Sequence, residues 1–165
     1  MTRLRLLAVA LLATLLGTGT GVVVRGAPDP APVGSRVAAL AVLRAWDAAR
    51  SRAWAEGDAA ALSALYVPGS AAGRADRRLL GAYAARGLRV EGLVMQVLAV
   101  RVVRAEPDRW VLRVTDRVAS ATAVGRGTRI ALPRDEPSTW MVVLRHVGGR
   151  WRVGSVSGCP AYPAR

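Results

Sequence analysis

The spacing of hydrophobic and polar positions changes near residue 88, about halfway along the chain. Upstream of this point, alanine and leucine recur every three or four residues, which is the period of a helix with one apolar face. Downstream, valine-rich stretches alternate with polar residues and are separated by turn signals, which is typical of β-strands. The pattern therefore predicts helices in the first half of the chain and a sheet in the second half.

Three helices are expected before the sheet. The first is a long helix that has Ser35 as its N-cap and runs to Glu56. Asp58 is the N-cap of a second helix, over residues 59–67, and a third helix covers about residues 71–86. A glycine or a proline follows each helix and ends it.

Four strands are expected in the second half, over residues 88–104, 109–124, 138–147 and 150–158. The first strand bends at Gly92, because glycine inside a strand weakens it and marks a bulge or bend. Residues 125–137 form a looser connection. Gly148 and Gly149 form a two-residue hairpin turn between the last two strands.

The first 24 residues form a separate targeting segment. Arg3 and Arg5 precede an apolar run over residues 6–16, which is the pattern of an export signal. The uncharged stretch continues to Val24, and this is also about long enough for a membrane-spanning helix. A cleaved signal peptide and a retained anchor both place the rest of the protein outside the cytoplasm, either secreted or held at the cell membrane.

Residues 25–34 are rich in proline and glycine and form a spacer before the domain, which covers residues 35–158. Residues 159–165 form a loose tail that contains Cys159, the single cysteine. One thiol cannot form an internal disulfide, so Cys159 is either incidental or available for an intermolecular disulfide or other thiol chemistry. No other cysteine or histidine lies near it in sequence, and we expect no metal site and no cofactor.

The charge is strongly basic but spread along the sequence. All 24 basic residues are arginine, and the formal net charge is +13 at pH 7. Nucleic-acid-binding faces group their basic residues and interleave them with aromatic side chains, and the sequence shows no such grouping. We therefore expect no nucleic-acid partner.

Two charged residues interrupt the apolar face of the first helix. Asp47 and Arg50 are three positions apart, so their side chains can meet on the helix surface. They either form a partly buried ion pair or face a pocket. In the first case, we expect Arg50→Leu to be tolerated better than replacement of Asp47 alone.

Strand alternation adds further polar candidates. Asp116 lies on the apolar face of the second strand. In the final hairpin, His146 faces the same way as Trp140 and Trp151. The two-residue turn predicts the cross-strand pairs His146–Trp151, Leu144–Val153 and Val142–Ser155.

Two short stretches carry a resemblance to a known superfamily. In AWAEGDAAALSALYVPGS, a first helix ends at Gly-Asp and a short second helix ends in an aromatic residue and a proline. In LRHVGGRWRVGSV, the second strand of a hairpin begins with tryptophan after a glycine turn. With these features and its element order, the domain resembles the cone-shaped fold shared by nuclear transport factor 2, ketosteroid isomerases, scytalone dehydratase and SnoaL-type polyketide cyclases. It is most similar to an exported actinobacterial member of that superfamily.

The resemblance implies an α+β fold in which three N-terminal helices pack on a curved antiparallel sheet. It also implies that the first helix closes the mouth of a cone, and that a homodimer forms through a sheet face such as that of Met141, Val143 and Val147. The polar groups available to the cone are Asp47, Arg50, Tyr66, Asp116, His146 and Ser155.

Two functions are consistent with this set. The expected one is a non-catalytic binding or accessory domain for a small apolar ligand or an envelope protein, with Arg50, Tyr66, Trp140, Trp151 and Ser155 as contacts. The alternative is an isomerase, dehydratase or cyclase of the polyketide-cyclase type. In that case His146 acts as general acid or base and is oriented by Asp116 or Asp47. The remaining tryptophans, Trp46, Trp54 and Trp110, are expected in the core.

Overall fold

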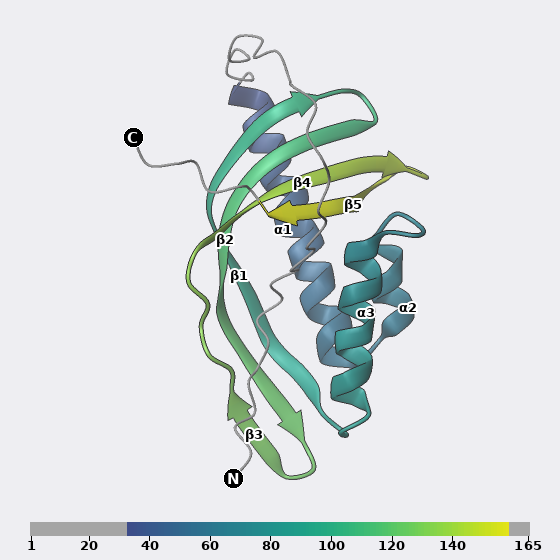
Figure 1. Ribbon diagram of the computed structural model, residues 1–165, viewed down its shortest axis with the longest axis vertical. Helices are drawn as coiled ribbons and strands as arrows, with labels where there is room; N and C mark the ends of the chain where they lie inside the picture. Colours follow the sequence, from purple (N-terminus) through teal and green to yellow (C-terminus); the bar gives the residue numbers. More distant parts are fainter. Residues whose placement is uncertain (1–32, 159–165) are drawn as a thin grey trace, which may run out of the picture.

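Three helices pack against one bent antiparallel sheet, which curves around them without closing into a barrel (Figure 1). The computed structural model describes residues 33–158. The long helix α1 lies along the sheet, and α2 and α3 lie together at one end of it. The α+β class and the three N-terminal helices are as predicted. The helices are α1 (Val33–Glu56), α2 (Ala59–Ala64) and α3 (Ala71–Ala84).

The helix ends follow local capping chemistry. The Asp58 carboxylate accepts hydrogen bonds from the backbone N–H groups of Ala60 and Ala61, at 2.9 and 2.8 Å, which confirms the predicted N-cap of α2. In contrast, α1 begins at Val33, so Ser35 lies inside the helix and is not its N-cap.

The second helix is shorter than predicted because its last residues pair with the sheet. Helix α2 ends at Ala64. The N–H of Val153 donates to the carbonyl of Leu65 at 3.0 Å, and the N–H of Val67 donates to the carbonyl of Val153 at 2.9 Å. Tyr66 therefore sits in a parallel bridge with Val153. This bridge fixes the position of the Tyr66 side chain relative to the sheet.

The sheet has the strand order β1-β2-β4-β5, and the short strand β3 pairs with the far end of β2. Strand β3 was not predicted, because residues 125–137 contain only a four-residue strand between turn residues. It forms because a tight turn at residues 125–128, with Arg126 at a φ of 50°, folds the chain back onto β2. The strands are β1 (Arg89–Ala105), β2 (Arg109–Gly125), β3 (Thr128–Ala131), β4 (Ser138–Val147) and β5 (Arg150–Gly158).

The predicted bend in the first strand is confirmed. Gly92 has a φ of 62°, and the pairing of β1 with β2 shifts register between Glu91 and Val94. The bend helps the long strands curve around the helices.

The final hairpin turns at Gly148 and Gly149, which both have positive φ, as the predicted two-residue turn requires. Near the turn, the pairs His146–Trp151 and Leu144–Val153 form as predicted.

Farther from the turn, a register shift breaks the predicted pairing. Between Val143 and Leu144 the ladder slips, so Ser155 lies opposite Val143, and Val142 lies opposite Val156. The predicted pair of Val142 and Ser155 is therefore wrong. Because a one-residue slip turns a side chain to the other face, Ser155 is exposed.

The core lies between the helices and the inner face of the sheet. Its largest fully buried side chains are Leu62, Leu112, Leu144 and Val153. Trp54 is buried with them as predicted, and Trp46 and Trp110 pack against this cluster while remaining partly exposed. On the other face of β4, Met141 and Val143 are half-buried and Val147 is exposed, and their proposed role in a homodimer stays a prediction.

Within residues 33–158, no helix is both long enough and apolar enough to cross a membrane. The predicted targeting segment at residues 1–24 and the tail with Cys159 lie outside the described residues.

Candidate functional site

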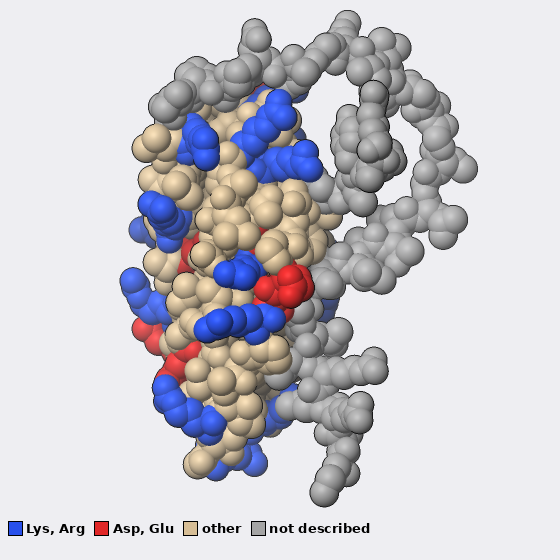
Figure 2. Space-filling model, turned by 90° about the vertical axis from the view of Figure 1, so that its left-hand side faces the viewer, with Lys and Arg blue, Asp and Glu red and all other residues tan. Residues whose placement is uncertain are grey.

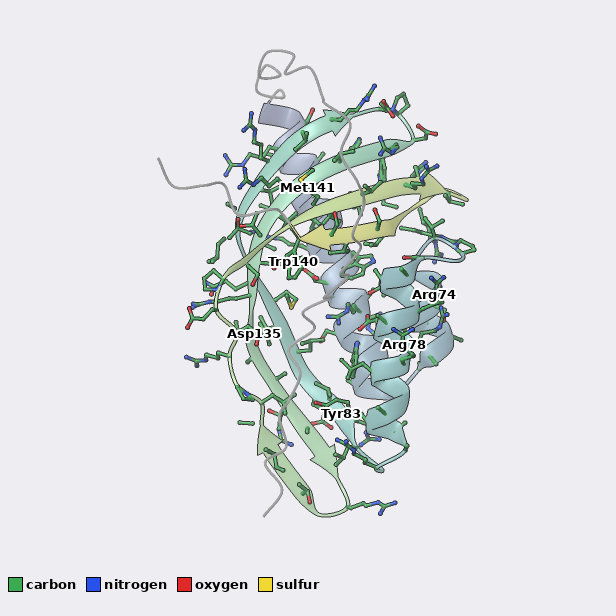
Figure 3. All side chains as sticks on the ribbon, viewed as in Figure 1. Arg74, Arg78, Tyr83, Asp135, Trp140 and Met141 are labelled. Atoms are coloured by element: carbon green, nitrogen blue, oxygen red, sulfur yellow. The ribbon has the colours of Figure 1, made fainter. Side chains whose placement is uncertain are left out.

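A cavity of about 440 Å³ lies between the helices and the inner face of the sheet. Its walls are mainly aliphatic and aromatic. In Figure 3, Trp140 on β4 and Tyr83 on α3 face this space from the sheet side and the helix side. The aromatic side chains that line the cavity are Trp46, Trp54, Tyr66, Tyr83 and Trp140.

A buried ion pair joins α1 to α3 at the wall of the cavity. Arg50 Nε donates to Asp76 Oδ2 and Arg50 Nη2 donates to Asp76 Oδ1, both at 2.7 Å. The side chains of Arg50 and Asp76 are only 13% and 4% exposed. The expected pairing of Arg50 with Asp47 is therefore wrong, because the packing of α3 against α1 places a better aligned carboxylate in reach of the guanidinium.

Two aromatic donors complete the hydrogen bonding of Asp76. Tyr66 Oη donates to Oδ2 at 2.7 Å, and the indole N–H of Trp54 donates to Oδ1 at 3.2 Å. Burial, together with the Asp76 carboxylate, raises the pKa of Tyr66, so its hydroxyl remains a donor. The Arg50 guanidinium also lies 5.9 Å from the ring centroids of both Trp46 and Trp54, within the range of a cation–π contact.

Asp76 was missed in the sequence, although a signal was present. Ala72, Asp76, Leu80 and Tyr83 recur at helical spacing on one side of α3, and the first three are buried. An aspartate on an apolar helix face predicts a buried partner, but the sequence does not say which arginine provides it.

Asp47 lines the cavity and has no ion-pair partner among residues 33–158. Burial raises its pKa to about 7, and the nearby Asp116 carboxylate adds to this rise, while the charge of Arg50 opposes it. Asp47 therefore changes its protonation state near neutral pH.

Asp116 also lines the cavity, on the apolar face of β2 where strand alternation placed it. Burial raises its pKa to about 6, and the Trp140 indole and the Arg50 charge partly offset this rise. Because their pKa values lie near 7 and 6, Asp47 and Asp116 form a pair of carboxyl groups that can donate and accept protons near neutral pH.

His146 lies outside the cavity. It is exposed near the end of the β4–β5 hairpin, its ring centroid is 5.1 Å from that of Trp151, and its backbone N–H donates to the carbonyl of Asp108. The expectation that Asp47 or Asp116 would orient His146 is therefore wrong, because the hairpin carries His146 away from the cavity-lining part of β4.

Two of the predicted ligand contacts are also displaced. Trp151 packs against Trp110, with ring centroids 4.3 Å apart, and does not line the cavity. Ser155 lies away from it because of the register shift in β4–β5. Arg50, Tyr66 and Trp140 do line the cavity, as predicted.

No group of three or more histidine, cysteine, aspartate and glutamate side chains in the described part of the chain is arranged to hold a metal ion. The polar groups of the cavity wall include the cluster around Asp76 and the carboxyl groups of Asp47 and Asp116, and the wall also contains Arg117, Asp135 and Glu136.

No protein-family model matches the sequence, and no curated protein matches it. Several solved structures are similar to this chain in fold. The intermembrane space region of the chloroplast protein ARC6 is 16% identical, with a TM-score of 0.55, over 76% of this chain and 97% of that one. Rv3472 from Mycobacterium tuberculosis, whose function is unknown, is 14% identical, with a TM-score of 0.50, over 76% and 73% of the two chains.

The similar structures also include a protein from Novosphingobium aromaticivorans named as NTF2-like with a cystatin-like fold. It is 18% identical to this chain, with a TM-score of 0.45, over 80% of this chain and 90% of that one. At these identities the likeness is one of fold.

Proposed function

We propose that the protein binds a small, mainly apolar molecule in the cavity between its helices and its sheet. The observation that carries this proposal is the cavity itself, because about 440 Å³ falls within the range of small-molecule pockets, roughly 300–1,000 Å³. Its wall is mainly apolar and aromatic, with a small number of polar groups, which is the composition typical of small-molecule pockets.

The polar groups of the wall support this proposal. Asp76 accepts hydrogen bonds from Arg50, Tyr66 and Trp54, so this cluster needs no ligand to satisfy it. Its hydrogen bonds fix the positions of the aromatic side chains of Trp54 on α1 and of Tyr66 after α2. A preformed pocket of this kind binds without a large ordering cost.

Fluorescence of phenylnaphthylamine, a neutral apolar fluorophore, tests the binding. Val118 lies in the cavity wall on β2, and Val111 lies on the same strand but not in the wall. We expect Val118→Trp to fill the space and abolish binding, while the matched variant Val111→Trp and the variant His146→Ala keep the wild-type affinity. Equal binding by the two tryptophan variants would refute the cavity as the site.

Acid–base catalysis is the second candidate, and the carboxyl pair of Asp47 and Asp116 favours it. One carboxyl that is protonated and one that is ionised near neutral pH can together move a proton next to a carbonyl, as isomerases and dehydratases do. In this form of the catalytic alternative, Asp47 and Asp116 act as the general acid and base, the role that was expected for His146.

Deuterium incorporation into enolisable ketones in heavy water, followed by NMR, tests this second candidate. Catalysed exchange should disappear in Asp47→Asn and Asp116→Asn and persist in His146→Ala. Absence of exchange in the wild-type protein over a broad ketone panel would leave binding as the supported function.

We also propose that the protein acts outside the cytoplasm, either secreted or held by its N-terminal segment. The support is the pair Arg3 and Arg5 before the apolar run of residues 6–16. Cell fractionation, with mass determination of the mature N-terminus, distinguishes a cleaved signal from a retained anchor.

A further inference from the structure

Acidic and basic side chains are unequally distributed between the cavity and the rest of the molecule. The chain has 24 arginines and 11 acidic residues. Five of the acidic residues line the cavity, but only two arginines do, Arg50 and Arg117. The cavity is therefore an acidic region in a strongly basic protein. The five acidic residues are Asp47, Asp76, Asp116, Asp135 and Glu136.

One of the two lining arginines is compensated by a carboxylate within the wall. Arg50 is held by Asp76 through two hydrogen bonds, so these two charges compensate each other. Arg117 Nε donates to Gln96 Oε1 at 2.8 Å, and because this amide oxygen is neutral, Arg117 keeps its positive charge. Four acidic side chains therefore remain against one arginine, and none of the four has an ion-pair partner among residues 33–158.

These four acidic side chains come from different sides of the cavity. Asp47 is on α1 and Asp116 is on β2, and both are half-buried. Asp135, which is labelled in Figure 3, and Glu136 lie on the connection that leads into β4. Glu136 is exposed. Trp140, a few residues farther along the chain, and Trp46 on α1 add aromatic faces to the same space.

We infer that the ligand of the cavity is an apolar cation, such as a hydrophobic amine. This inference rests on the proposed binding function and names its ligand class. The apolar body of the ligand packs against the aromatic and aliphatic wall, and its ammonium group pairs with Asp47 and Asp116. The ring faces of Trp46 and Trp140 also attract a cation.

The alternatives are electrostatically worse. A neutral apolar ligand would remove water from the half-buried side chains of Asp47 and Asp116 without supplying a counter-charge, which is costly whenever these carboxyl groups are ionised. An anion would add repulsion from four acidic groups. A cation compensates the charges that the protein itself leaves uncompensated.

Arginine side chains lie on the exterior of the sheet, and this surface is therefore not expected to bind a cation. On the face of the sheet turned away from the core, Arg101 lies opposite Arg113, and Arg145 lies between Arg109 and Arg152. Figure 2 shows arginines at spaced positions over one side of the molecule, with few acidic side chains among them. At physiological salt these charges are screened over about 8 Å, so they act weakly on a ligand inside the cavity.

Isothermal titration of the full-length protein with three probes of similar shape tests the inference. The probes are naphthylethylamine, naphthylethanol and naphthylacetate, which are cationic, neutral and anionic at pH 8. We expect the amine to bind about tenfold more tightly than the alcohol, and the acid to bind most weakly. Asp47→Asn and Asp116→Asn should each reduce the preference for the amine while leaving the affinity for the alcohol within about twofold.

A matched control separates a local effect from one of net charge. Asp108 is exposed in the β1–β2 turn, outside the cavity wall, and Asp108→Asn removes the same charge as the two test variants. It should keep the full preference for the amine. Equal loss in all three variants would overturn the inference.

The probe series also separates this inference from the proposed function. Equal binding of the alcohol and the amine, or preference for the acid, would overturn the inference and leave apolar binding in place. No binding of any probe would overturn the proposed function, and the inference with it.

Discussion

Arg50 on α1 holds Asp76 on α3 through two hydrogen bonds of 2.7 Å, across 26 positions of sequence. Tyr66 donates to the same carboxylate from the segment that follows α2, so one buried aspartate ties together three parts of the helical layer. This cluster forms part of the cavity wall, and the stability of the fold and the shape of the pocket therefore depend on the same contacts.

Removing one member of the ion pair should be strongly destabilising. In Arg50→Leu, the Asp76 carboxylate, which is 4% exposed, loses both charged hydrogen bonds, and we expect a loss of about 3–5 kcal/mol in the free energy of unfolding. Asp47→Leu should cost little or nothing, because Asp47 has no ion-pair partner in the described residues. This order is the reverse of the one expected from the sequence. Urea unfolding measures both variants.

The double variant Arg50→Leu with Asp76→Leu is the control for this prediction. Replacing a buried ion pair by apolar side chains is often close to neutral, so the double variant should recover much of the loss. If the double variant lost as much free energy of unfolding as the two single variants added together, a direct coupling between the two charges would be contradicted.

Two glycines in α3 should respond in opposite directions to alanine. A Cβ added at Gly73 would lie 2.8 Å from both Cβ and Cγ of Tyr66, and Tyr66 is held by its bridge to the sheet and its bond to Asp76. We expect Gly73→Ala to destabilise the protein by about 1–3 kcal/mol through overpacking. It should also weaken probe binding, because Tyr66 lines the cavity.

Gly81→Ala is the matched control in the same helix. A Cβ at Gly81 meets no atom within 4 Å, so the variant should gain about 0.5–1 kcal/mol from the better helix propensity of alanine. Thermal unfolding followed by circular dichroism measures both variants. Similar melting temperatures for the two would show that Tyr66 can move aside.

Asp47 should make the protein less stable as pH rises from about 4 to about 7. The pKa of Asp47 is about 7 in the folded protein, against 3.8 for an ordinary aspartate. As pH rises, the carboxyl therefore loses its proton at a lower pH in the unfolded chain than in the folded protein. The folded state binds more protons in this range, and the free energy of unfolding falls with rising pH until the folded carboxyl also ionises. Asp116, with a pKa of about 6, contributes in the same direction up to about pH 6.

Asp47→Asn isolates this contribution, because an amide does not titrate. We expect the variant to gain stability relative to the wild type as pH rises from 4 to 7, by at most about 3–4 kcal/mol and by less where solvent screens the half-exposed carboxyl, and the difference to level off above pH 7. Urea unfolding at a series of pH values measures the difference. Parallel stability curves for the two proteins would mean that Asp47 is not desolvated.

Elements that depend on neighbouring residues could be predicted from the amino-acid sequence. The Asp58 cap, the bend at Gly92 and the turn at Gly148 and Gly149 each follow from the chemistry of a few adjacent positions, and each is present in the structure. The change of period near residue 88 separated helices from sheet for the same reason. The position of Asp116 on the cavity side of β2 also followed from alternation along one strand.

Contacts between residues far apart in the chain depend on how the helices and strands pack. Asp47 is three positions from Arg50, but the guanidinium binds Asp76, because the packing of α3 against α1 determines which carboxylate fits its geometry. A register shift between Val143 and Leu144 turned Ser155 away from the cavity, and the length of the hairpin left His146 outside it. These outcomes depend on contacts between segments far apart in the chain, so local periodicity and spacing could not fix them.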